Sequence, residues 1–196
     1  MTTQPAPSMD PNLVLLTGEN SFISLSDEAG GDATTSASHW RVDFSPAGPG
    51  HVLFLRSELT ENEWQVFADN IALARWLQGG IQGYLNAESG DQAIPVVEAE
   101  FERIGDTRAF WTETITTLDE DLALTWYDFQ PSMLFHKIAG DGDRYGICTV
   151  FVPALGARVT LDGVHAGGSS WPSDREGRPS STSCLALSES WTQGSA

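Results

Sequence analysis

The chain has 196 residues, of which 40% are hydrophobic and 10% aromatic, a composition that supports one sizeable core and one domain. Its 27 acidic and 10 basic residues give a net charge of −17, which repels phosphate backbones and anionic lipid headgroups. We therefore do not expect nucleic acids or membranes as partners. The chain opens without a basic segment and apolar run, and no window has the ~18 apolar residues of a membrane helix, so we expect a cytoplasmic protein.

The first part of the chain predicts a tail, a loop and a hairpin. Residues 1–12 are rich in Pro, Ser and Thr and predict a loose tail, so that 13–196 forms the single domain. Residues 26–38 are small and polar, which is typical of a flexible loop able to act as a lid. The segments flanking the turn-forming PAGPG at 46–50 alternate apolar and polar residues and predict a hairpin.

One amphipathic helix is expected at about 61–78. Thr60 and Glu63 fit a capping box, and apolar residues recur at helical spacing from Trp64 to Leu77. Several glycines follow and end the periodic pattern.

From Pro95 onward the chain is a series of β-rich segments with short connections, which indicates an antiparallel sheet. A sheet with this many strands removes its edges by curling, so we expect a mainly β protein with a closed or half-open barrel. The pattern resembles a calycin or lipocalin-type barrel in gross layout, but the early GxW motif of that group is absent. The irregular segment 165–183 is a second candidate lid.

Two predicted strands carry carboxylates for which we expect different surroundings. Glu98, Glu100 and Glu102 alternate with apolar residues, so they share one face, which we expect to point to water. In the alternative, these three carboxylates line a cavity. Trp111 and Glu113 also share a strand face. If that face points inward, Glu113 is poorly solvated and becomes a candidate acid or base, with Trp111 contacting the substrate.

The stretch LTWYDFQPSMLFHKI, residues 124–138, predicts a hairpin that turns at Gln130–Ser132. If Phe129 pairs with Met133, Asp128 comes within reach of His136, whereas a slip of one residue separates them.

The first register gives an acid–base pair in this stretch. His136 is then the candidate acid or base, Asp128 its orienting partner, and Tyr127 or Lys137 the group that polarises the substrate. The alternatives are a core histidine at 136 and, for the only lysine of the chain, an exposed side chain.

Aromatic and basic residues complete the predicted binding site. Two arginines in the loop 171–181 of this acidic chain are suited to hold an anionic ligand, although a self-paired, solvated loop is the alternative. The expected substrate contacts are Trp111, Trp126, Phe135, Trp171, Arg175 and Arg178.

No motif predicts a metal or a cofactor. The four histidines lack HxH and HExxH spacing, GDGDRYG (140–146) leads into a strand and not a helix, and no GxSxG occurs. Cys148 and Cys184 lack CxxC spacing and are expected to be buried free thiols.

These features predict a small cofactor-independent enzyme of the lyase, isomerase or cyclase type. It would perform acid/base chemistry, such as isomerisation, cyclisation, elimination or hydration, on an apolar or aromatic small molecule in a barrel cavity. The alternative is a non-catalytic, lipocalin-like binding protein for a hydrophobic small molecule. A homo-oligomer is compatible with both functions.

Overall fold

The computed structural model describes residues 13–140 and 143–193, so the predicted tail, residues 1–12, lies outside the described residues. The main sheet is built from β1 (Val14–Leu25), β2 (Thr35–Phe44), β3 (Gly50–Arg56), β4 (Gln65–Ala68), β5 (Val96–Glu98), β6 (Glu100–Asp106), β7 (Phe110–Thr116), β8 (Asp121–Phe129), β9 (Met133–Lys137), β10 (Tyr145–Leu161), β11 (Val164–His165) and β14 (Cys184–Gln193). The remaining elements are the hairpin of β12 (Pro172–Arg175) and β13 (Arg178–Ser181), the helices α1 (Ile71–Gly79) and α2 (Ile81–Leu85), and the 3₁₀ turn η2 (Glu58–Thr60).

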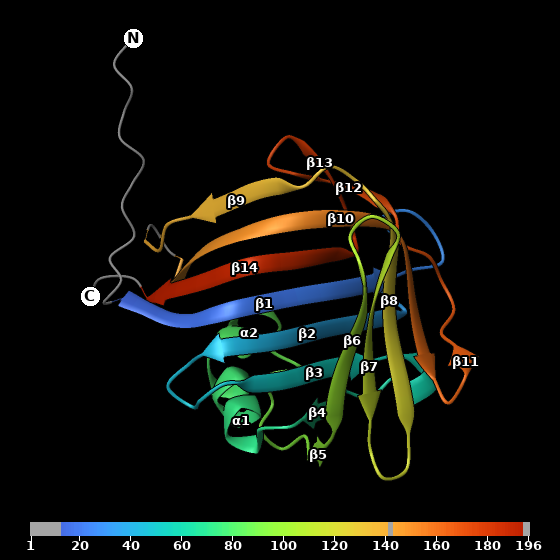
Figure 1. Cartoon of the computed structure of the whole chain (residues 1–196), viewed down its shortest axis with the longest axis horizontal. Helices are drawn as coiled ribbons and strands as arrows, with labels where there is room; N and C mark the ends of the chain where they lie inside the picture. The colour runs from blue at the N-terminus through green and yellow to red at the C-terminus, as the bar shows by residue number, and fades with distance from the viewer. Residues whose placement is uncertain (1–12, 141–142, 194–196) are drawn as a thin grey trace.

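The main sheet is strongly curled and forms a half-barrel, which confirms the predicted fold class (Figure 1). Its strands follow the order β5-β4-β3-β2-β1-β14-β10-β8-β7-β6, and β9 and β11 pair with β10. The pairs are antiparallel apart from β4 and β5. The described part of the chain contains no helix that is both long and apolar enough to cross a membrane.

Two apolar cores lie on opposite faces of the sheet. On the inner face, β1–β4 pack against β6–β8 and the second half of β10 around Trp126, whose Nε1 donates to the carbonyl of Phe22 at 3.0 Å. On the outer face, α1 and α2 cover Trp40, whose Nε1 donates to Gln82 Oε1 at 2.8 Å. The inside of the half-barrel is therefore filled at its centre.

The predicted helix at 61–78 is wrong over its first half, because residues 65–68 are strand β4 and α1 begins at Ile71. Val66 packs in the outer core and Phe67 in the inner core. Only a strand points successive side chains to opposite faces, so burial between two cores overrides the helical spacing. The side chain of Asn70 caps α1 by accepting from the backbone N–H of Leu73 at 3.1 Å.

The predicted hairpin over residues 124–138 is also wrong, because β8 and β9 pair with different halves of the 17-residue strand β10. Phe129 lies opposite Ala154 and His136 opposite Cys148. The six intervening steps along β10 span roughly 20 Å, so Asp128 and His136 do not pair. Because both strands run antiparallel to β10 and pair with successive segments of it, they run in the same direction, and residues 130–132 link them without a reversal.

We expect Gly18→Ala to destabilise the fold strongly. Gly18 lies at a bulge with φ +154°, and a Cβ there would lie 2.1 Å from the backbone oxygen of Arg41. Strain and clash together predict a loss of about 3 kcal/mol in the free energy of unfolding, measured by urea titration. Gly177→Ala is the control, since its φ is +77° but no atom lies within 4 Å of the added Cβ. Equal losses in both variants would contradict the clash.

Candidate functional site

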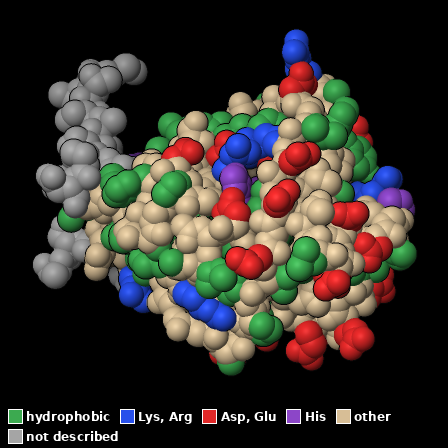
Figure 2. Space-filling model, turned by 60° about the horizontal axis from the view of Figure 1, so that its bottom comes forward, with side chains coloured by type: hydrophobic (Ala, Val, Ile, Leu, Met, Phe, Trp, Pro, Cys, Tyr) green, Lys and Arg blue, Asp and Glu red, His purple; other side chains and the backbone are tan. Residues whose placement is uncertain are grey.

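The inner face is polar at one end of the half-barrel, beyond the apolar core. Strand register places Glu19 of β1 opposite Arg41 of β2, and Arg41 opposite His51 of β3. Arg41 and His51 line an open hollow of about 810 Å³, together with Val42, Asp43, Pro49, Gly50, Asp69, Asn70, Ile71 and Glu98. We call this hollow the mouth. In the view of Figure 2, histidine, basic and acidic side chains gather around a depression in the surface.

A His–Asp pair lies at the mouth. His51 Nδ1 is 2.6 Å from Asp69 Oδ2, and the backbone N–H of His51 donates to Asp69 Oδ1, also at 2.6 Å. Asp69 is fixed because it joins the end of β4 to the cap of α1. Since a carboxylate only accepts, the proton of this contact belongs to Nδ1. Nε2 is then left as the ring nitrogen that exchanges protons with other groups.

Aromatic rings hold His51 in place. Its ring stacks on Phe101 of β6, with centroids 5.3 Å apart and an interplanar angle of 19°. His39 lies behind both rings, 5.7 Å from Phe101 and 6.4 Å from His51 between centroids, and is only 1% exposed. Burial, reinforced by the neighbouring His51 and by Arg103, holds the pKa of His39 well below its usual value, so this ring is neutral at pH 7. Its Nε2 has no hydrogen-bond partner among the described residues.

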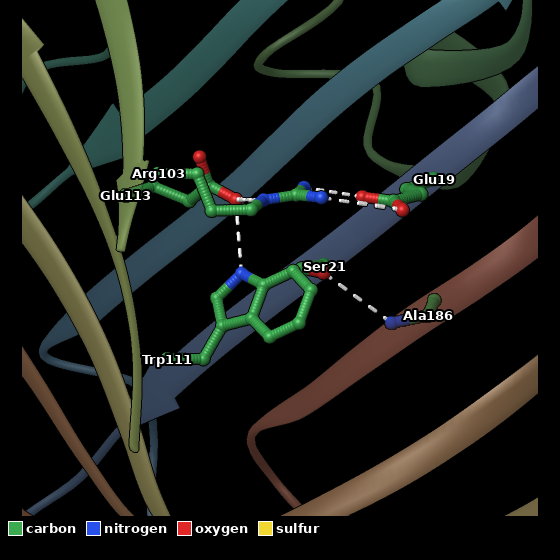
Figure 3. Close-up of polar contacts among 6 residues, drawn as sticks. All are labelled: Glu19, Ser21, Arg103, Trp111, Glu113 and Ala186. Atoms are coloured by element: carbon green, nitrogen blue, oxygen red, sulfur yellow. Dashed lines mark hydrogen bonds and ion pairs between the residues drawn. The ribbon is translucent and has the colours of Figure 1, made fainter. Parts of the chain in front are cut away.

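Arg103 links the two walls of the half-barrel (Figure 3). Its guanidinium bonds Glu19 of β1 through Nη2, and its Nε donates to Glu113 Oε1 of β7 at 2.5 Å. The indole Nε1 of Trp111 donates to the same Glu113 oxygen at 2.9 Å, and the guanidinium lies 4.3 Å from the centre of the Trp111 ring. Burial alone would lower the pKa of Arg103, but the two carboxylates outweigh it and raise that pKa, so the charge persists.

A second polar contact of β1 joins this strand to β14. Ser21, two residues after Glu19, accepts a hydrogen bond from the backbone N–H of Ala186 at 3.3 Å (Figure 3). Glu113 is 1% exposed, and its Oε2 has no partner among the described residues. The network therefore leaves one buried carboxylate oxygen able to accept a hydrogen bond.

The structure brings together only part of the predicted site. Trp111 and Glu113 lie side by side on the inner face, as their shared parity on the strand predicts. Sequence reasoning missed Arg103, although it has the same strand parity as the inward-pointing Phe101. It also missed the pair of His51 and Asp69, which no local spacing connects.

The other predicted catalytic residues lie away from the mouth. Asp128 and His136 are exposed. Lys137 is exposed and bonds Asp143 at 2.8 Å, and this hydrogen bond raises its pKa, so the amine stays protonated. Tyr127 packs over Gly156, where an added Cβ would lie 2.1 Å from its ring.

The predicted substrate contacts are dispersed as well. Trp126 belongs to the inner core, and Trp171 Nε1 donates to the carbonyl of Ser26 at 3.1 Å. Phe135 and Arg175 line a groove on the outer face, while Arg178 donates to the carbonyl of Leu134 at 2.8 Å. Glu98, Glu100 and Glu102 are exposed, as expected, and Glu98 also lines the open mouth. Both cysteines are free; Cys184 is buried, which raises its pKa, whereas Cys148 is only partly buried.

Comparisons of the chain with protein-family models, curated proteins and solved structures find no match. No residue role is therefore carried over from a relative. Among residues 13–140 and 143–193, no three His, Cys, Asp or Glu side chains are grouped to hold a metal ion.

Proposed function

We propose that the protein is a small cofactor-independent enzyme that performs proton-transfer chemistry on a small organic molecule at the mouth. The observation that carries this proposal is the pairing of His51 with Asp69 directly opposite Arg41, at an open hollow, with the His51 ring stacked on Phe101. A histidine oriented by a carboxylate, with a cation on the neighbouring strand, is suited to acid/base catalysis.

The chemistry follows from the positions of these groups. His51 Nε2 takes a proton from a carbon next to a carbonyl, the C–H bond breaks, and its electron pair moves onto the carbonyl oxygen as an enolate. Directly opposed residues on neighbouring strands have Cβ atoms ~5 Å apart, so Arg41 is placed to stabilise this oxyanion. Asp69 stabilises the imidazolium. Returning the proton at another atom gives isomerisation, and loss of a leaving group gives elimination.

The alternative function, a non-catalytic lipocalin-like binding protein, needs an apolar cavity inside the barrel. Buried side chains of β1–β4, β7, β8, β10 and β14 pack together there, and the partly buried Phe101 of β6 packs against them. The open polar mouth is accordingly the better site, and a substrate with a carbonyl group and an apolar body fits its charged residues and the apolar side chains of Val42, Pro49 and Ile71 in its lining.

The test is catalysed hydrogen exchange. Small carbonyl compounds that raise the melting temperature are incubated with the protein in D₂O, and loss of the C–H signal next to the carbonyl is followed by ¹H NMR. We expect wild-type protein to exchange at least one such compound and His51→Gln to slow the exchange by about 10²–10⁴-fold. Asp69→Asn should slow it as well.

The matched control is His136→Gln, which changes an exposed histidine on β9. Its exchange rate should equal that of wild type. If His136→Gln were the slow variant and His51→Gln the unaffected one, the base would be misassigned. Binding without exchange in wild type would instead favour the binding-protein alternative.

A further inference from the structure

The outer face carries a second site, a groove of about 310 Å³ between α2 and the β12–β13 hairpin. Its volume lies at the lower end of the range typical of small-molecule sites. We call it the outer groove; its lining residues are Asn20, Phe22, Tyr84, Leu85, Phe135, Lys137, Tyr145, Ile147, Phe151, Arg175, Glu189 and Trp191. Most of these side chains are aromatic or apolar, so the groove suits a small hydrophobic body.

A cation with an unused donor lies at one end of the outer groove. The guanidinium of Arg175 lies 4.4 Å from the ring centre of Phe151, 5.7 Å from that of Phe22 and 5.8 Å from that of Phe135. Its Nε is buried, and among the described residues it has no hydrogen-bond partner. A guanidinium donor without an acceptor, in an aromatic setting, favours a bound carboxylate, because charge-assisted hydrogen bonds gain strength when water is excluded.

The floor of the groove contains a carboxyl group that is kept neutral. Glu189 is 2% exposed and accepts from the indole Nε1 of Trp191. Burial raises its pKa to about 8, and the nearby Glu19 acts in the same direction, while hydrogen bonds from Trp191 and Thr149 oppose the shift. At pH 7 this side chain therefore adds no negative charge that would repel an anion in the groove.

We propose that the outer groove binds a small hydrophobic monocarboxylate, with its carboxylate on Arg175 and its apolar body along Phe151, Tyr145 and Trp191. The second cation of the groove, Lys137, is already paired with Asp143 at 2.8 Å, so Arg175 is the anchor. A groove of this volume holds a body of the size of a phenylalkyl chain. This site is separate from the mouth, which lies on the opposite face of the sheet.

Calorimetry with a matched pair of ligands tests the proposal. The probes are 4-phenylbutyrate and its uncharged analogue 4-phenylbutan-1-ol, titrated into the full chain at pH 7. We expect the acid to bind at least about tenfold more tightly than the alcohol, as one charge-assisted hydrogen bond predicts. Arg175→Gln should abolish this preference and leave binding of the alcohol unchanged. Arg178→Gln, on the same hairpin but outside the groove lining, should retain it.

NMR locates the bound acid independently. The indole N–H signal of Trp191, assigned with Trp191→Phe, should shift on addition of 4-phenylbutyrate, and that of Trp64, which donates to Glu88, should not. Equal affinity for acid and alcohol, an equal loss in both arginine variants, a shift confined to Trp64, or no binding at millimolar concentration would each overturn the proposal.

Discussion

Replacing Arg103 with methionine is expected to lower the free energy of unfolding by about 3–5 kcal/mol. The substitution leaves Glu113, which is 1% exposed, and the partly buried Glu19 without their shared cation. It also removes the guanidinium from the face of Trp111. A buried carboxylate that loses its counter-ion incurs its full desolvation cost, and this dominates the loss. Urea unfolding at pH 7 measures the effect.

Two further variants separate this cause from a general loss of charge. The double variant with Arg103→Met and Glu113→Gln should recover part of the loss, because no buried charge is then left unpaired on β7. Arg108→Met removes an arginine whose side chain is 90% exposed and paired with Asp106, and should cost less than about 0.5 kcal/mol. Equal losses for Arg103→Met and Arg108→Met would show that the network does not hold the two walls together.

Glu189→Gln should change how stability depends on pH. The pKa of Glu189 rises from its ordinary value of 4.5 to about 8 in the folded chain, so between these values the unfolded chain releases a proton that the folded chain retains. The stabilisation due to this group is complete below pH 4.5 and is lost as the pH rises to about 8. The lost contribution is on the order of 3 kcal/mol at pH 7.

Urea titrations at pH 5, 6, 7 and 8 measure this dependence. The difference between wild type and Glu189→Gln should grow in favour of the variant as the pH rises, because glutamine cannot ionise but can still accept from Trp191. Glu100→Gln, at an exposed position, should run parallel to wild type. A parallel curve for Glu189→Gln would show that this carboxyl titrates normally.

The half-barrel was predictable because alternation along most strands is strong. Two errors have physical causes that act over long distances. Val66 and Phe67 lie in different cores, which no local periodicity reveals, so the helix was extended over β4. The hairpin predicted over residues 124–138 does not form, because the 17-residue strand β10 is long enough to pair with β8 and β9 one after the other.

The candidate site was less predictable than the fold. Trp111 and Glu113 are two residues apart on one strand, so their shared face could be predicted. Phe101 and Arg103 are also two residues apart, so an inward-pointing Phe101 implies an inward-pointing Arg103. The pair of His51 and Asp69 depends on β3 pairing with β4 and on the strand-to-helix junction after β4. The sequence predicts an Asp-oriented histidine at His136, which does not pair with Asp128. The pair that does form, His51 and Asp69, joins segments with no recognisable spacing.

The role proposed for His51 requires a ring that is protonated on Nδ1, toward Asp69, and unprotonated on Nε2. Long-range ¹H–¹⁵N NMR at pH 8 observes both nitrogens of each histidine and so tests this requirement directly. We expect His51 in the Nδ1–H form in wild type and a loss of that preference in Asp69→Asn. A His51 ring protonated on Nε2 in wild type would contradict its assignment as the base.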